Sequence, residues 1–378
     1  MDSLTQIVLG AAVGEAVLGK KLGNRAMLWG AIAGTIPDLD VFIKYFTDEI
    51  TSTELHRGVS HSLVFSIIMA IVLGWLVNKN EKLALGLLVV SVFGLGAIVT
   101  TFPLLQILLP ILILGLIWLI YKVNIKSTAT PTEWGKLFFW SLVTHPLLDA
   151  NTTWGTQFFW PFDYRLAFKN IFVVDPLYTI PFMVFVIIAM FYKRNNPKRT
   201  RFNNIGLIVS STYMLWSFVS KGIGYYQFQQ ELQQQEIQYV DLETKPTPFN
   251  TILWNAQVET ETGYKMGYYS LFDSKPIGFS EEFTKNHYLL DPYKEVEAVQ
   301  QLIKISTGMY LVDKVEEGLI FTDIRFGQMG LNYEDQFPWM YLISEKDGIV
   351  SVNKIDPEFD TDKIGKVFSD LGERIKGN

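Results

Sequence analysis

The sequence predicts a mainly helical integral membrane protein: a polytopic membrane domain of about six to eight hydrophobic helices, followed by a small α+β soluble domain. Two observations support this. Of all 378 residues, 49% are apolar, and the first 220 contain repeated runs close to the roughly 20 apolar residues that cross a bilayer. After residue 220 these runs give way to alternating β-branched and aromatic residues, which are typical of strands.

Apolar runs between charged breaks predict the membrane helices. The stretch from Lys82 to Tyr121 is too long for one crossing, and Pro103 offers a turn within it, so it is counted as two helices. The first, second and sixth helices are expected to be buried or re-entrant, because polar residues interrupt or end them. The expected ranges are 3–19, 26–46, 62–78, 83–100, 104–121, 135–150, 171–192 and 202–220.

The second part of the chain is expected to leave the membrane. Residues 221–240 are rich in Gln and predict an amphipathic juxtamembrane helix, and residues 241–378 predict the soluble domain. His287 is the only histidine of that domain and its carboxylates are scattered, so a lid, docking or stabilising module is expected. A hairpin is expected around Gly263, further strands near 308–314, 317–326, 338–345 and 348–354, and helices near 293–305 and 361–375.

Composition excludes some partners and chemistries. The formal net charge is −6 and there is no long basic tract, so no nucleic-acid partner is expected. Cysteine is absent, so any metal would be held by imidazole and carboxylate groups. The opening MDSLTQIVLG lacks the basic segment and small-residue cleavage site of a removable signal peptide, so the first helix is expected to be retained.

The motif HPLLD places His145 and Asp149 four residues apart, on one face of a helix and about one turn from each other. Two such side chains can bind one ion, although the same spacing also suits a simple hydrogen-bonded pair. Pro146 predicts that the helix starts, kinks or unwinds at this point.

The motif PDLD contains Asp38 and Asp40, which are two residues apart and therefore do not share a helix face. They can converge only where the backbone turns, which Pro37 favours. The alternative is a structural role as an N-cap and a first-turn acid. Charged residues at membrane depth are costly and usually face a functional interior, which favours metal ligation.

The motif HRGVSH contains His56 and His61, with Gly58 providing a flexible loop and Ser60 placed to cap the next helix. Arg57 lies between the two histidines. A guanidinium can hold a phosphate or carboxylate through two parallel hydrogen bonds, and it can equally extend toward lipid headgroups.

The three motifs together predict a metal site. Three of the four histidines and three carboxylates fall at the same predicted end of the membrane helices. Such donors suit one or two divalent ions, with zinc favoured over manganese or magnesium. Two ions bridged by an Asp would be the usual arrangement for phosphoester hydrolysis. The expected ligands are Asp38, Asp40, His56, His61, His145 and Asp149.

Positive charge predicts the orientation, because Lys and Arg in short loops favour the cytoplasm. The basic segment 193–201 is therefore expected inside. Counting back through eight full crossings places the metal site and the C-terminal domain on the extracytoplasmic side of the cell membrane.

The motifs PDLD, HRGVSHS and HPLLDANTTWGTQFFWP resemble the signatures of the membrane-bound metal-dependent hydrolase family, the YdjM-like integral membrane proteins. The resemblance covers roughly residues 1–220 and implies a hydrolase. Many members have His where this chain has Gln6, which could instead hydrogen-bond a ligand or water. Positions at the family spacing are His56, Arg57, Gly58, His61, Ser62, His145, Asp149, Thr152, Gly155 and Pro161.

The function expected from these residues is metal-dependent hydrolysis at the membrane surface, on a lipid or lipid-linked phosphoester, by a metal-activated water. Asp40 is expected to accept the proton of the water, Arg57 to hold an anionic group of the substrate, and Thr152 to orient a ligand. An aromatic belt at headgroup depth is expected from Trp154, Phe158, Phe159 and Trp160.

Two other functions remain open at this stage. Intramembrane Asp and His also mark ion pathways, so an ion or small-molecule transporter is possible, although no inverted repeat is evident. The other alternative is a non-enzymatic receptor or scaffold with a structural metal, in which the C-terminal domain binds a protein partner.

Overall fold

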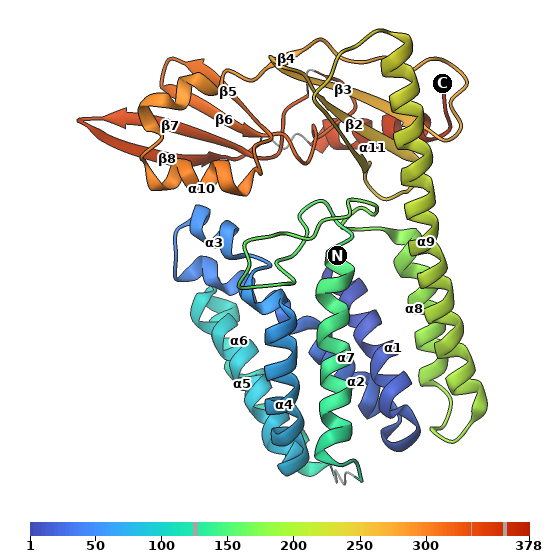
Figure 1. The fold of residues 1–378 in the computed structure, drawn as a ribbon. Coiled ribbons are helices and arrows are strands. Elements are labelled where there is room, and N and C mark those ends of the chain that lie inside the picture. The colour runs from blue at the N-terminus through green and yellow to red at the C-terminus, as the bar shows by residue number, and fades with distance from the viewer. Residues whose placement is uncertain (124–127, 334, 358–360) are drawn as a thin grey trace.

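The computed structural model describes residues 1–123, 128–333, 335–357 and 361–378. The first part of the chain forms a bundle of helices that run side by side, and the C-terminal domain lies across one end of it (Figure 1). The N-terminus lies at that same end. The helices of this part are α1 Ser3–Leu22, α2 Asn24–Thr35, η1 Pro37–Tyr45, α3 Glu49–Leu55, η2 Val59–His61, α4 Leu63–Lys79, α5 Glu81–Val99, α6 Pro103–Lys122, α7 Pro131–Asp149, α8 Pro176–Met190 and α9 Pro197–Gln234.

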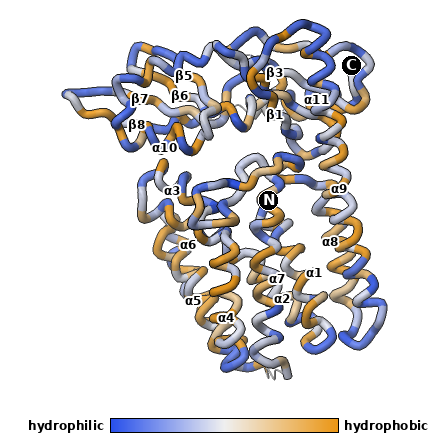
Figure 2. The backbone as a smooth tube through the Cα atoms, viewed as in Figure 1, coloured by the Kyte–Doolittle hydropathy of each residue, from blue (hydrophilic) through white to orange (hydrophobic). Residues whose placement is uncertain are grey.

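The expectation of six to eight hydrophobic membrane helices is not supported. Among the described residues, α5 and α6 are long and apolar enough to cross a membrane, and there are up to four spans if each of two bent pairs counts as one. The run expected at 26–46 bends by 44° between α2 and η1, and α8 has only 15 residues. Figure 2 shows that α5 and α6 are hydrophobic along most of their length, while the loops at the end away from the C-terminal domain are hydrophilic.

Helices α1 and α2 pack backbone against backbone. A Cβ atom at Gly10 would collide with the carbonyl of Gly30, and one at Gly34 would collide with the carbonyl of Gln6. Small residues of this kind allow two helices to approach closely. The close contact positions the end of α2, and η1 after it, against α7.

Helix α7 lies in the middle of the bundle, where it contacts α1, α2 and α4. It begins with a capping box: the side chain of Thr130 accepts a hydrogen bond from the Glu133 N–H, and the side chain of Glu133 accepts one from the Thr130 N–H. Trp134 and Phe138 are fully buried on its inner face. Pro146 lies inside the last turn of this helix, so the predicted start or unwinding at Pro146 is wrong.

The basic loops gather at the end of the bundle opposite the C-terminal domain (Figure 1). There Arg194 donates a hydrogen bond to the carbonyl of Lys21 at 2.8 Å, which joins the α8–α9 loop to the α1–α2 turn. Arg199 forms a buried ion pair with Glu15, and Lys21 pairs with Glu133 at the start of α7. Basic side chains of α1, of the α8–α9 loop and of α9 therefore lie together at this end.

Helix α9 has 38 residues and connects the bundle to the C-terminal domain without a break. The membrane helix expected at 202–220 and the amphipathic helix expected after it are thus one helix. The C-terminal domain contains two antiparallel sheets with strand orders β1-β2-β3-β4 and β5-β6-β7-β8. Its elements are β1 Asp241–Pro246, β2 Leu253–Glu259, β3 Gly263–Ser270, β4 Phe283–Thr284, η3 His287–Tyr293, α10 Glu297–Ile305, β5 Tyr310–Val315, β6 Gly318–Asp323, β7 Met340–Lys346, β8 Ile349–Ile355 and α11 Thr361–Ile375.

A second connection between the two parts of the chain is made by α3. Ile50 is buried in the hydrophobic core of the C-terminal domain, together with Val299 and Leu302 of α10. Around it, Lys304 pairs with Glu54 at 2.9 Å. The C-terminal domain is therefore held both by the chain itself through α9 and by packing contacts, among them that of α3.

Candidate metal centre

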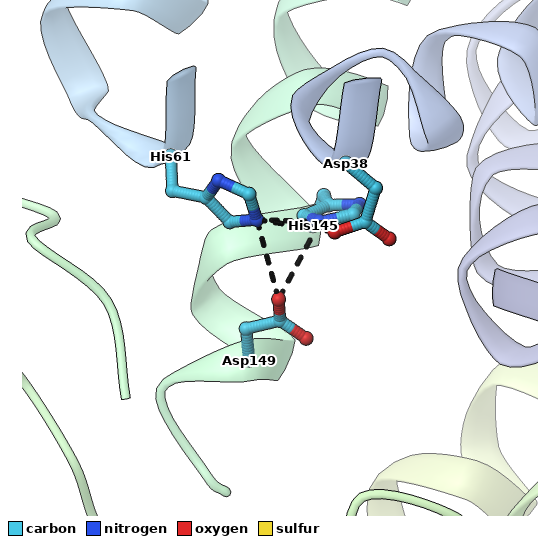
Figure 3. Close-up of side chains that lie close together, drawn as sticks. All are labelled: Asp38, His61, His145 and Asp149. Carbon is cyan, nitrogen blue, oxygen red and sulfur yellow. Dashed lines mark hydrogen bonds and ion pairs between the residues drawn. The ribbon is translucent and has the colours of Figure 1, made fainter. Parts of the chain in front are cut away.

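Four side chains from three separate motifs meet at the end of the bundle that faces the C-terminal domain. Ligand atoms of Asp38, His61, His145 and Asp149 all lie within 4.8 Å of one another. Figure 3 shows the two imidazole rings and the two carboxylates pointing into one space, from η1, from η2 and from the last turns of α7. His61, His145 and Asp149 are fully buried, whereas the side chain of Asp38 is 20% exposed.

The hydrogen bonds of the two histidines fix which nitrogen faces the centre. The Nδ1 of His145 lies 2.6 Å from the carbonyl oxygen of Gly34, which can only accept. Nδ1 therefore donates, and Nε2 is the nitrogen that faces the centre. In His61, Nδ1 lies 3.0 Å from the hydroxyl of Ser60 and 3.3 Å from the carboxylate of Asp40. Its Nε2 lies 3.1 Å from the Nε2 of His145.

Asp149 adds a carboxylate oxygen that no hydrogen bond satisfies. Its Oδ1 accepts from the side-chain amide of Gln6 at 2.9 Å and contacts the Met1 amine. Its Oδ2 is buried, has no hydrogen-bond partner among the described residues, and lies 3.4 Å from the Nε2 of His61. Oδ2 also lies 3.2 Å from the Nε of Arg57, an ion pair without hydrogen-bond geometry. A buried carboxylate oxygen that accepts no hydrogen bond, beside two imidazole nitrogens, could bind a metal ion.

Asp40 and His56, both predicted as ligands, lie outside this group of four. Asp40 accepts hydrogen bonds from the backbone N–H of Arg57 at 2.9 Å and from the hydroxyl of Ser60 at 2.8 Å. Its other oxygen lies 2.9 Å from the Nδ1 of His56. Both oxygens of Asp40 have partners among the described residues, so Asp40 lies behind the two histidines and not among the four converging side chains. It instead holds His56 and His61 in place, as carboxylates behind metal-binding histidines do.

Arg57 connects the two acidic groups of the site. Its φ of 59° lies in the left-handed region, which is strained for a residue other than glycine. In this conformation the backbone N–H bonds to Asp40, while the guanidinium Nε lies 3.2 Å from Oδ2 of Asp149. Its Nη1 donates to the hydroxyl of Thr152 at 2.8 Å, and that hydroxyl donates to the carbonyl of Asp149 at 2.7 Å. Thr152 therefore orients Arg57 and contacts the backbone of a ligand.

A cavity of about 650 Å³ lies beside the cluster, between the bundle and the C-terminal domain. His56, Arg57 and Thr152 line it, although Arg57 and Thr152 themselves are largely buried, so the cavity reaches the residues next to the four-residue cluster. The remaining lining residues are Val41, Lys44, Ser52, Thr53, Thr153, Trp154, Phe172, Val173, Pro248, Phe326, Gln328, Met329, Pro338 and Trp339.

The chain was compared with known protein families, curated proteins and solved structures. Residues 1–224 match the YdjM inner membrane protein family. The chain belongs to this family. The match includes all four cluster residues and ends within α9, before the C-terminal domain. No curated protein and no solved structure matches the chain.

Membership of the YdjM inner membrane protein family, together with the apolar helices, places the chain in a membrane. By the resemblance found in the sequence, many YdjM-like proteins have His at the position of Gln6. Gln6 does bond to Asp149, and its amide also contacts the carbonyl of His145 at 3.3 Å. It therefore supports two ligand residues without supplying a ligand of the group.

Several contributions to the site were missed or misplaced by sequence reasoning. Ser60 does not cap α4, because the side chain of Ser62 accepts from the Phe65 N–H and is the cap. Arg165 was not predicted at all, yet it donates to the carbonyl of His56 at 3.0 Å. Burial lowers the pKa of Arg165 to about 10, so it stays protonated at neutral pH. Arg165 lies far from the HRGVSH motif in the sequence, so no local pattern indicated this contact.

Of the four residues predicted to form an aromatic belt, two are exposed. Phe159 and Trp160 are exposed, at 50% and 36%. Phe158 is buried, and Trp154 stacks on Phe326 of the C-terminal domain with ring centroids 5.6 Å apart. Phe158 is therefore covered by protein side chains, whereas Trp154 is partly buried against the C-terminal domain and lines the cavity.

Proposed function

We propose that this chain is an integral-membrane, divalent-metal-dependent hydrolase that acts on a lipid or lipid-linked phosphoester. The observation that supports this most directly is the convergence of Asp38, His61, His145 and Asp149 beside a cavity lined by Arg57. A structural metal would not need an adjoining cavity, whereas a catalytic one does, because the substrate must reach it.

The four converging side chains would hold one ion. Two imidazole nitrogens and two carboxylate oxygens suit zinc, and manganese or magnesium are the alternatives. A bound ion of this type lowers the pKa of a water and polarises the bond to be cleaved. The unsatisfied Oδ2 of Asp149 and the facing Nε2 atoms are the features of this chain that fit such an ion.

Arg57 and His56 are the residues proposed to act on the substrate. Arg57 lines the cavity with its charged group next to Asp149, so it would bind an anionic phosphoryl oxygen. His56 also lines the cavity, and Asp40 occupies its Nδ1, which leaves Nε2 for the substrate. That nitrogen would donate a proton to the departing alcohol. Asp40, which was predicted as the base, acts in this proposal by holding His56.

We further propose that the site and the C-terminal domain lie on the extracytoplasmic side. The clustered basic turns at the opposite end of the bundle support this orientation, because such turns favour the cytoplasm. A cysteine introduced at Tyr288, which is 67% exposed in the C-terminal domain, should react with a membrane-impermeant thiol reagent in intact cells. Labelling only after the cells are broken would show that the C-terminal domain lies on the cytoplasmic side.

The function is tested on purified full-length protein. Metal analysis should find about one divalent ion per chain, and the protein should release phosphate or a phosphorylated headgroup from lipid phosphoesters. A chelator should abolish this activity and zinc should restore it. Metal-free protein, or activity that persists in the double variant His61→Ala and Asp149→Ala, would overturn the proposal. Metal uptake into vesicles without hydrolysis would favour a transporter instead.

A further inference from the structure

We infer that the C-terminal domain forms one wall of the substrate cavity and binds the apolar chain of the substrate. This inference rests on the proposed function, since it assigns a second part of the substrate to the same cavity. The sequence predicted a separate lid, docking or stabilising module for this domain. The residues that line the cavity from the C-terminal domain are Pro248, Phe326, Gln328, Met329, Pro338 and Trp339.

An aromatic cluster crosses the boundary between the two parts of the chain. Trp154, which follows the ligand motif HPLLD, stacks on Phe326 with an interplanar angle of 20°. Trp339 completes the cluster, with ring centroids 6.0 Å from Trp154 and 5.8 Å from Phe326. All three residues are only partly buried and all three line the cavity. The cavity therefore has an aromatic surface to which both parts contribute.

The polarity of the cavity differs between its two sides. The charged and titratable lining residues, Lys44, His56 and Arg57, all come from the bundle. Of the described lining residues of the C-terminal domain, Gln328 and the indole N–H of Trp339 are the side chains that can donate a hydrogen bond, and the others are apolar or aromatic. A sugar or nucleotide would need several hydrogen-bonding partners there. An amphiphile, with its phosphoryl group at Arg57 and its acyl or prenyl chain against Phe326, matches both sides.

The segment that carries Phe326 is held in place from inside the domain. The buried side chain of Lys245 bonds to the carbonyl of Arg325, and that of Gln257 bonds to the carbonyl of Ile324. Arg325 itself pairs with Asp323 and lies over the ring of Trp154, 5.1 Å from the centroid. The aromatic wall is thus fixed before a substrate arrives, which lowers the entropic cost of binding.

The inference is tested by equilibrium binding of two phosphonates to the full-length, metal-loaded protein. Octylphosphonate and methylphosphonate share the anionic group and differ in the apolar chain. Wild-type protein should bind octylphosphonate at least about tenfold more tightly, because the chain leaves water. Phe326→Ala and Met329→Glu should each reduce this ratio at least about threefold while leaving methylphosphonate binding and metal content unchanged.

The matched control is Ile349→Ala, an apolar truncation in the same domain at a residue that is 72% exposed and outside the cavity. It should keep the wild-type ratio. An unchanged ratio in both cavity variants would overturn the inference, as would equal losses for the two phosphonates. If wild-type protein hydrolyses no phosphoester but the ratios change as expected, the proposed reaction fails and the binding role of the C-terminal domain stands.

Discussion

The Nε2 atoms of His61 and His145 lie 3.1 Å apart and face each other between two carboxylates. Each ring is held from behind through Nδ1, by Ser60 and Asp40 in one case and by the carbonyl of Gly34 in the other. At this distance a proton on one Nε2 would form a hydrogen bond to the other, and a bound cation would take the place of that proton. This relationship is the basis of the first prediction.

His61→Ala and His145→Ala should each reduce metal affinity by more than about a hundredfold, because the loss of a ligand exceeds the 10–100-fold effect of the residues behind it. Dialysis against a competing chelator, followed by metal analysis, measures this. His287→Ala is the matched control, because His287 bonds to the carbonyl of Tyr310 in the C-terminal domain. Equal metal retention in all three variants would contradict the assignment.

Asp40→Asn should lower metal affinity by about 10–100-fold, because Asp40 holds His61 from behind and is not itself a ligand. His56→Ala should leave metal affinity within about threefold of wild type and reduce kcat by about 10²–10⁴-fold, the usual contribution of a general acid. Metal titration and kinetics on the same preparations separate the two effects. Complete loss of metal from His56→Ala would make His56 a ligand after all.

Arg57→Lys should lower kcat/KM for a phosphoester by about 10–100-fold, since a charge-assisted hydrogen bond contributes about 1.5–3 kcal/mol and lysine lacks the planar fork of arginine. Metal content should not change. Arg201→Lys, at an exposed position at the other end of the bundle, is the control. Wild-type kinetics in Arg57→Lys would show that the guanidinium does not contact the substrate.

Ile50→Ala should destabilise the protein by about 2–5 kcal/mol, because it leaves a cavity in the core of the C-terminal domain. Lys304→Ala breaks an ion pair with Glu54 whose lysine side chain is 49% exposed, and should cost less than about 1 kcal/mol. Thermal denaturation of the two variants in the same detergent compares them. A larger loss in Lys304→Ala would mean that charge, and not apolar packing, fixes α3 to the domain.

Lys245 should make stability depend on pH. Burial holds the pKa of Lys245 well below its usual value in the folded protein, so between the two pKa values the unfolded chain binds more protons. Stability should therefore rise with pH in this window, by at most about 1.4 kcal/mol per pH unit, and level off near the ordinary lysine pKa. Lys245→Met should remove this contribution, while Lys346→Met, at an exposed position, should not. If the thermal midpoints of wild type and Lys245→Met depended on pH in the same way, Lys245 would not contribute to the pH dependence of stability.

Local pattern predicted much of the fold. The strands β2, β3 and β5 to β8 and the helix α11 occur where alternation and amphipathic spacing indicated them. Strand β1, with the sequence DLETKP, was missed because its polar residues and its proline are unusual for a strand. The helix expected from residue 171 begins at Pro176, where Asp175 caps it.

The site was predictable only in part. The i to i+4 spacing of His145 and Asp149 does put both on one face of α7. The turn of η1 decides that Asp38 joins the cluster and Asp40 does not. The sequence does not show which carboxylate contacts a histidine that is distant in the chain. Arg165 and Phe326 come from segments far away in the chain, and tertiary packing alone brings them to the cavity.

Helix α3 lies in the sequence between Asp38 and His61, so the segment that joins two ligands is also the segment clamped by the C-terminal domain through Ile50. Displacing that domain would pull on the connection between the two ligands and alter their spacing. Mechanical strain or a binding event on the C-terminal domain would thereby be transmitted to the candidate metal centre.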